Sequence, residues 1–129
     1  MKDDKLWKIF STYIRLRDSD ASGYCQCITC GYTGEWTRFD CGHSIPRQHK
    51  ATKFHEQNNH AQCKRCNAFE GGKREVYKER INKKYGNGTW EKLEVMSRAT
   101  CKRGKFEIDV LIKHYKGEVE KLKKLKHIT

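Results

Sequence analysis

The sequence predicts a single domain of the α+β class, in which a core of short strands lies between helical segments at the two ends of the chain. Two Cys-x2-Cys units, Cys27 to Cys30 and Cys63 to Cys66, stand 32 residues apart, and this interval has room for strands and a return loop. Outside these units, apolar residues recur at helical spacing. We therefore divide residues 1–129 into an N-terminal helix (1–20), a core (24–85) and a C-terminal helical extension (86–129).

The charge balance points to a polyanionic partner. The 129 residues include 28 lysines and arginines against 16 aspartates and glutamates, which gives a net charge of +12. Basic surfaces gain affinity for nucleic acids by releasing the counterions of the phosphates. Only 36% of the residues are hydrophobic, and no stretch reaches the roughly 18 apolar residues of a membrane span. We expect a nucleic acid as the partner and no membrane.

The cysteine count argues against a secreted disulfide protein. There are seven cysteines, an odd number, and the start Met1-Lys-Asp-Asp lacks the apolar segment of an export signal. The expected location is cytoplasmic, where thiols stay reduced. A core this small also gains stability from a bound metal.

The N-terminal segment predicts a helix over residues 3–17. Asp3 or Asp4 can cap its start, and the turn-forming run from Asp18 to Gly23 ends it. Its apolar residues follow helical spacing: Leu6, Ile9, Phe10, Tyr13 and Ile14.

The core predicts short strands followed by a helix. Strand signals extend from Tyr24 to Phe39, and a second short strand is expected from Cys41 to Ile45, ended by Pro46. Residues 47–62 are polar and predict an irregular loop. A helix is predicted from Lys73 to Tyr85, with Gly86 at its end.

The C-terminal extension predicts a short helix after Thr89 and a long amphipathic helix from about Phe106 to Lys126. The long helix carries a heptad-like seam of Ile108, Ile112, Tyr115, Val119 and Leu122. Packing of this seam on its own domain is the favoured interpretation, because the pattern is short for a coiled coil. The alternative is a homodimer contact through this helix.

The two Cys-x2-Cys units predict one structural zinc site. Four thiolates suit a tetrahedral Zn²⁺ ion, and a two-residue interval aims both sulfurs of a unit at the same ion. We expect Cys27, Cys30, Cys63 and Cys66 as the ligands, with Cys25 as an alternative to Cys27. Cys41 and Cys101 are expected to be ordinary small buried side chains.

A resemblance to known nucleases rests on two runs, Asp40-Cys-Gly-His43 and Asn58-Asn-His60-Ala-Gln-Cys63-Lys-Arg-Cys66-Asn67. They resemble the HNH or His-Me finger nucleases, and most closely the phage recombination endonucleases of the NinG (Rap) family. The resemblance implies a zinc-stapled ββα-metal core and cleavage of branched recombination DNA, such as Holliday junctions or displacement loops. It also implies the cytoplasm of a bacterial host, if the chain is phage-encoded.

The expected chemistry is metal-dependent hydrolysis of a phosphodiester. His43 is the candidate base, because imidazole titrates near neutral pH. Asp40 and Asn67 are oxygen ligands suited to a catalytic Mg²⁺ or Mn²⁺, with His60 as an auxiliary ligand. Asn58 matches the family's central asparagine, which orients the loop of the base, and Asn59 is the alternative.

Basic residues surround these positions in the sequence. Arg47 is expected to contact the scissile phosphate. The shared positive charge of the others predicts a phosphate track on DNA, formed by Lys50, Lys53, Lys64, Arg65, Lys73 and Arg74.

Other functions fit parts of the same pattern. A non-catalytic zinc-containing DNA-binding module needs the basic charge and the cysteines but not His43. An HNH nuclease of the restriction or homing type would cut duplex DNA. An RNA-binding protein could stack bases on Tyr32, Trp36 and Phe39.

Overall fold

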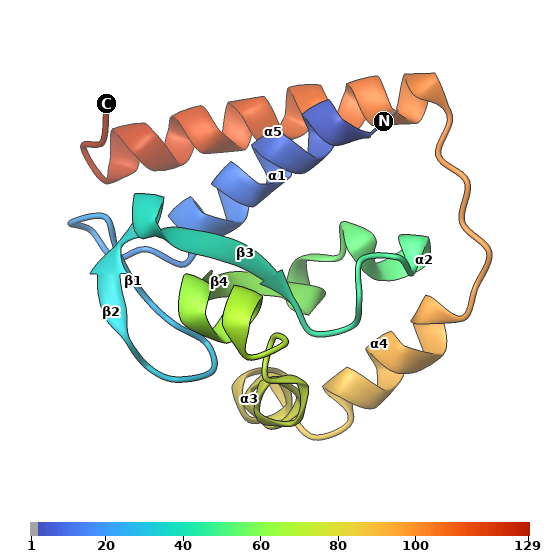
Figure 1. The fold of residues 1–129 in the computed structure, drawn as a ribbon. Coiled ribbons are helices and arrows are strands. Elements are labelled where there is room, and N and C mark those ends of the chain that lie inside the picture. Colours follow the sequence, from blue (N-terminus) through green and yellow to red (C-terminus); the bar gives the residue numbers. More distant parts are fainter. Residues whose placement is uncertain (1–2) are drawn as a thin grey trace.

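The structure is a computed structural model that describes residues 3–129. Helix α1 (Asp4–Arg17) lies beside the long helix α5 (Lys105–Leu125), although the two are far apart in the sequence, and together they form one layer (Figure 1). Below this layer lies the strand pair β3 (Phe39–His43) and β4 (Asn59–Cys63). Helices α3 (Arg74–Tyr85) and α4 (Thr89–Ser97) lie on the side of this strand pair that faces away from α1 and α5.

The strands form two separate antiparallel pairs. The first is a hairpin of β1 (Tyr24–Gln26) and β2 (Thr33–Glu35). In the second, β3 pairs with β4 so that Phe39 lies opposite Cys63 and His43 lies opposite Asn59. The expected strand over residues 41–45 therefore begins two residues earlier and ends at His43.

The segment 47–62, expected to be an irregular loop, is largely structured. It contains α2 (Lys50–Lys53), a 3₁₀ turn (Glu56–Asn58) and most of β4. The prediction failed at β4 because the strand is rich in polar residues, yet all five of its residues are buried. Apart from Oε1 of Gln62, the amide and imidazole groups of these residues have hydrogen-bond partners inside the fold, which offsets the cost of burying them.

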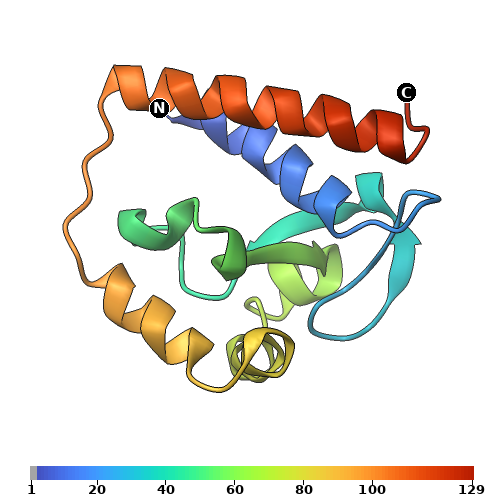
Figure 2. The same cartoon turned by 180° about the vertical axis from the view of Figure 1, so that it is seen from behind.

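The helices match the sequence predictions closely. The predicted helix over 73–85 is confirmed as α3, and Gly86 follows it with a φ of 117°, a conformation that favours glycine. Between β4 and α3 lies a π-helical turn (Arg65–Phe69). Helices α3 and α4, at the bottom of Figure 2, pack through a cluster of Ile45, Tyr77, Ile81 and Leu93.

The main apolar core lies between α1 and α5. Phe10 contacts Phe54 and Tyr115 edge to face, with ring centroids 5.4 and 5.0 Å apart. In the predicted seam of α5, Ile108 and Tyr115 belong to this core and Val119 is also buried. The seam therefore packs within the chain, so the homodimer, which stays a prediction, would have to use other residues. Among residues 3–129, no helix has the length and apolar character needed to cross a membrane.

Candidate functional site

The two Cys-x2-Cys units meet in space. The sulfur atoms of Cys27, Cys30, Cys63 and Cys66 all lie within 4.8 Å of one another. The sulfurs of Cys30 and Cys63 are 3.7 Å apart, close to the roughly 3.8 Å edge of a tetrahedron whose corners lie about 2.3 Å from a zinc ion. The four cysteines can therefore hold one structural zinc ion.

Hydrogen bonds within the cluster favour the thiolate of Cys27, whereas burial raises the pKa of the Cys63 and Cys66 thiols. The backbone N–H groups of Cys63 and Tyr32 donate to the sulfurs of Cys27 and Cys30, at 3.3 and 3.4 Å. Burial alone raises the pKa of the Cys27 thiol, but the hydrogen bonds from Cys63 and from Thr29 outweigh it and lower the pKa to about 6. The thiolate is the form that binds zinc.

The other three cysteines lie outside this cluster. Cys25 is buried, its Sγ donates to the carbonyl of Arg15 at 3.1 Å, and burial raises its pKa to about 12. Cys27, rather than Cys25, is therefore the candidate zinc ligand. Cys41 is buried as expected, whereas Cys101 corrects the expectation, because it is partly exposed and lines a pocket.

His43 ends β3 at the edge of that pocket. Its ring stacks on Trp7, with centroids 4.8 Å apart and planes 17° from parallel. Its Nε2 atom is buried and has no hydrogen-bond partner among the described residues. Burial lowers the pKa of His43 to about 4, the charge of Arg47 acts in the same direction, and a hydrogen bond with the Lys53 backbone opposes both. At neutral pH the imidazole is therefore uncharged, and its buried Nε2 atom has no hydrogen-bond partner among the described residues.

Two buried asparagines hold the backbone behind His43. The side chain of Asn58 accepts from the N–H of Ile45 at 2.8 Å, and it donates to the carbonyls of Ile45 and Thr52. Asn59 donates to the carbonyls of Lys53 and His55. The loop that leaves β3 after His43 is thus fixed to the start of β4.

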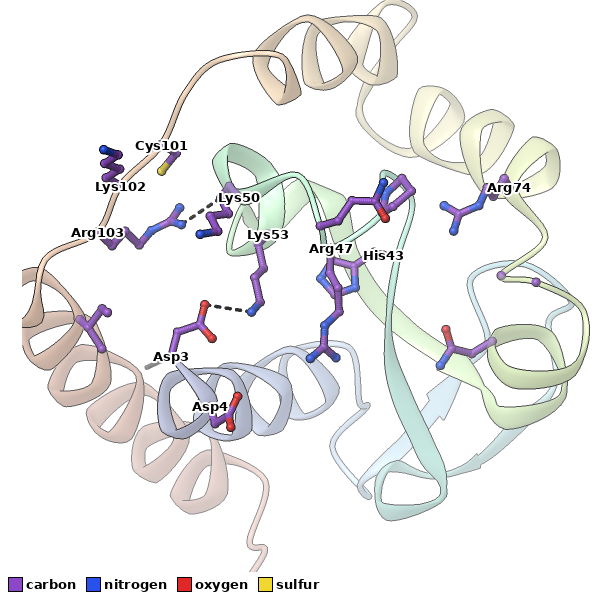
Figure 3. Close-up of a pocket in the computed structure, with 16 residues that line it drawn as sticks. Asp3, Asp4, His43, Arg47, Lys50, Lys53, Arg74, Cys101, Lys102 and Arg103 are labelled. Atoms are coloured by element: carbon purple, nitrogen blue, oxygen red, sulfur yellow. Dashed lines mark hydrogen bonds and ion pairs between the residues drawn. The ribbon is translucent and has the colours of Figure 1, made fainter. Parts of the chain in front are cut away.

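The pocket at His43 has a volume of about 930 Å³ and is strongly basic. We call it the basic pocket. Figure 3 shows its labelled side chains, which come from the N-terminal end of α1, from β3 and the loop after it, from α2, from the start of α3 and from the linker between α4 and α5. Its cationic residues are Arg47, Lys50, Lys53, Arg74, Lys102 and Arg103, against the acidic residues Asp3 and Asp4.

Internal contacts fix several of these cations. Lys53 Nζ pairs with Asp3 at 2.9 Å, and Arg103 donates to the carbonyl of Lys50 (Figure 3). Arg74 donates to the carbonyl of Ser44, and the Arg47 guanidinium lies 5.0 Å from the centre of the Trp7 ring. Arg47 and His43 therefore contact the same tryptophan.

The predicted cation ligands Asp40 and Asn67 contact each other, but only Asn67 lines the basic pocket. Asn67 lines the basic pocket with His43, but Asp40 does not belong to its lining. The carboxylate of Asp40 accepts from Lys64 at 2.6 Å and from the Asn67 amide at 3.0 Å. Asp40 and His43 also point to opposite faces of β3, because side chains alternate along a strand.

His60 lies in the interior, which corrects its expected role as an auxiliary ligand. Its Nδ1 and Nε2 atoms lie 3.3 and 2.6 Å from the hydroxyls of Tyr77 and Tyr85. Burial lowers its pKa to about 3. Both ring nitrogens have partners, so neither is free to bind a cation.

The predicted phosphate track is only partly assembled. Lys50, Lys53 and Arg74 line the basic pocket, whereas Lys64, Arg65 and Lys73 lie outside its lining and pair with acids. The aromatic surface for RNA bases is also incomplete, because Phe39 is buried.

Sequence reasoning missed Trp7, Lys102 and Arg103. Trp7 was hidden within a helix whose other apolar residues form a core, and its partners His43 and Arg47 are distant in sequence. The run Cys101-Lys-Arg-Gly after α4 was the available signal for the linker. Only the fold shows that this linker returns to the pocket.

The comparisons with known proteins give one family. The family model described as "Bacteriophage Lambda NinG protein" matches residues 2–126 of the chain. Comparisons with curated proteins and with solved structures give no match.

Proposed function

Since this chain belongs to the bacteriophage lambda NinG family, we propose that it is a metal-dependent DNA endonuclease of the HNH or His-Me finger type. The order of β3, β4 and the following helical turn supports a ββα-metal core. The observation that carries the proposal is the partnerless Nε2 of His43, buried at the edge of a basic pocket.

His43 acts as the base in this proposal. Its neutral imidazole accepts a proton from a water molecule as the water oxygen forms a bond to phosphorus and the bond from phosphorus to the leaving oxygen breaks. A bound phosphate brings negative charge next to the ring, which favours the imidazolium and raises the low pKa of the free protein. The base therefore becomes stronger when substrate is present.

In this proposal, the arginines of the basic pocket bind the phosphate of the substrate. Arg47 is exposed and shares the Trp7 ring with His43, so a phosphate bound by its guanidinium lies beside the base. Arg74 is held by Ser44, the residue that follows His43. Charge-assisted hydrogen bonds from such groups orient the scissile bond and stabilise developing negative charge.

Asn67 is the predicted cation ligand that remains in the basic pocket. An amide oxygen suits Mg²⁺ or Mn²⁺, whereas Asp40 is occupied by Lys64 and Asn67 and would join the ligands only after releasing them. A cation at this place would neutralise charge on the phosphate. By family, the proposed substrate is branched recombination DNA.

A cleavage assay tests the proposal. Junction, displacement-loop and linear duplex substrates are incubated with the protein in Mg²⁺, Mn²⁺ or EDTA. Wild type is expected to cut in the presence of a divalent cation and not in EDTA. His43→Ala is expected to lose at least about 100-fold in rate, the usual worth of a general base, while its DNA binding persists. His114→Ala, which removes an exposed histidine of α5, is the matched control and should cut normally.

A second candidate is a non-catalytic zinc-containing DNA-binding module. The observation that favours it is the carboxylate of Asp40, which is already held by Lys64 and Asn67. Under this alternative, wild type binds every substrate and cuts none in any metal.

For the endonuclease proposal, near-normal cleavage by His43→Ala protein would show that His43 is not the base.

A further inference from the structure

A second basic pocket lies apart from His43. It has a volume of about 690 Å³ and shares no lining residue with the basic pocket. We call it the α3 pocket, since the second half of α3 forms one wall, and the end of α1 and the loop after β1 form the others. Its charged and titratable lining residues are Arg17, Asp18, His60, Arg80, Lys83 and Lys84.

The cations of α3 are uncompensated in this pocket. The Asp18 carboxylate pairs with Arg17 at 2.8 Å and accepts from the N–H of Ala61 at 2.8 Å, so it is already used. Across residues 3–129, no salt bridge is formed by Arg80, Lys83 or Lys84. Three positive charges at a concave surface therefore remain for an anion.

The spacing of these cations suits successive phosphates rather than one small ion. Arg80 precedes Lys83 by three residues and Lys84 by four, so the three side chains lie on neighbouring turns of α3. They are exposed, and each can contact a different phosphate of a strand that follows the helix. Arg74, the first residue of α3, lines the basic pocket. It lies roughly 9 Å along the helix axis from Arg80.

The side chains of His43 and His60 point to different faces of the β3–β4 pair. Opposed residues of neighbouring strands point to the same face, and His60 lies opposite Gly42. Since side chains alternate along β3, His43 points to the other face. His43, which lines the basic pocket, and His60, which lines the α3 pocket, therefore lie on opposite faces of the pair.

We propose that the α3 pocket binds backbone phosphates in a second arm of branched DNA, while the first arm occupies the basic pocket. This inference rests on the proposed function for its ligand. It explains, from the chain alone, how a single protomer can prefer a branch to a linear duplex.

Binding measurements in a cleavage-deficient background test this proposal. In His43→Ala protein, the triple change Arg80→Gln, Lys83→Gln and Lys84→Gln is compared with a matched neutralisation on the exposed face of α5. The matched triple changes are Lys113→Gln, Lys116→Gln and Lys124→Gln. Circular dichroism and zinc content establish that both proteins are folded.

The α3 triple variant is expected to raise the Kd for a four-way junction on the order of tenfold. Loss of three phosphate contacts should also make the slope of log K against log salt shallower by about 2.7. The Kd for linear duplex should stay unchanged, and the α5 triple variant should affect the two substrates equally. An equal loss on junction and duplex, or no loss on the junction, would overturn the second-arm assignment. The readout is binding alone, so a wild type that cuts nothing defeats the proposed function and leaves this result standing.

Discussion

The buried imidazole of His60 is expected to make the folded protein less stable as the pH falls. Its side chain is 1% exposed and lies between Tyr77 and Tyr85. The Tyr77 hydroxyl donates to the carbonyl of Gly42 at 2.7 Å, so its oxygen accepts from Nδ1–H of His60. The Nε2 atom must then accept from the Tyr85 hydroxyl, and the neutral tautomer of His60 is fixed.

The magnitude follows from the pKa of this imidazole. Burial lowers it to about 3, opposed by the charge of Asp18, whereas the unfolded chain has the ordinary value of about 6.5. As the pH falls below about 6.5, the unfolded state takes up a proton that the folded state refuses until about pH 3. Stability is therefore lost over that window, by roughly 5 kcal/mol in full and by about 1.0 to 1.4 kcal/mol for each pH unit below 6.

Urea unfolding at pH 7.5, 6.0 and 5.0, in excess zinc, measures this loss. His60→Gln should be less stable than wild type at pH 7.5, because two hydrogen bonds are altered, but its free energy of unfolding should fall less steeply on acidification. The difference in slope isolates His60, since His43 and the cysteines are the same in both proteins. His114→Gln, at an exposed position, should keep the wild-type slope. If His60→Gln also kept that slope, the reasoning from burial would be refuted.

Three further results are expected. Cys27→Ser should abolish the binding of one zinc ion per chain and unfold the protein, whereas Cys25→Ser should retain the metal, as measured by zinc content and circular dichroism. Phe10→Ala should lower the free energy of unfolding by about 3 to 5 kcal/mol in urea titrations, because it leaves a cavity in the core between α1 and α5. Gly42→Ala should lower the melting temperature, since a Cβ at this position clashes with the side chain of Gln62, and overpacking of this kind costs about 1 to 3 kcal/mol. A Gly42→Ala protein as stable as wild type would show that Gln62 moves aside freely.

The helices were predictable because their apolar residues follow one period. In α1 and α5 the residues at helical spacing are the same ones that meet in the core, such as Phe10 and Tyr115. No such signal marks β4, where Asn59 and His60 are buried and paired with groups from other segments. A local pattern reports the burial of apolar side chains, but it does not report a polar side chain whose partners lie elsewhere in the chain.

The candidate site also has one part that the sequence predicts and one part that it does not. The zinc cluster could be predicted because two residues between cysteines fix the local geometry, and this spacing also favoured Cys27 over Cys25. The surroundings of His43 could not be predicted, because the ring that stacks on it belongs to Trp7 and the cations facing it include Arg103. These contacts depend on how α1 and the linker before α5 cross the strands.

The strand pair β3–β4 connects the zinc cluster to the pocket and separates their roles. Cys63 lies opposite Phe39 at one end of the pair, and His43 lies opposite Asn59 at the other. Four residue steps at about 3.3 Å place His43 roughly 13 Å along the strand from the cysteine end. A zinc ion bound there is too far away to touch a phosphate beside His43, so any catalytic cation must be a second ion. The zinc cluster instead fixes the register at one end of the pair, while the buried amide of Asn59 holds the other, and the orientation of His43 depends on both.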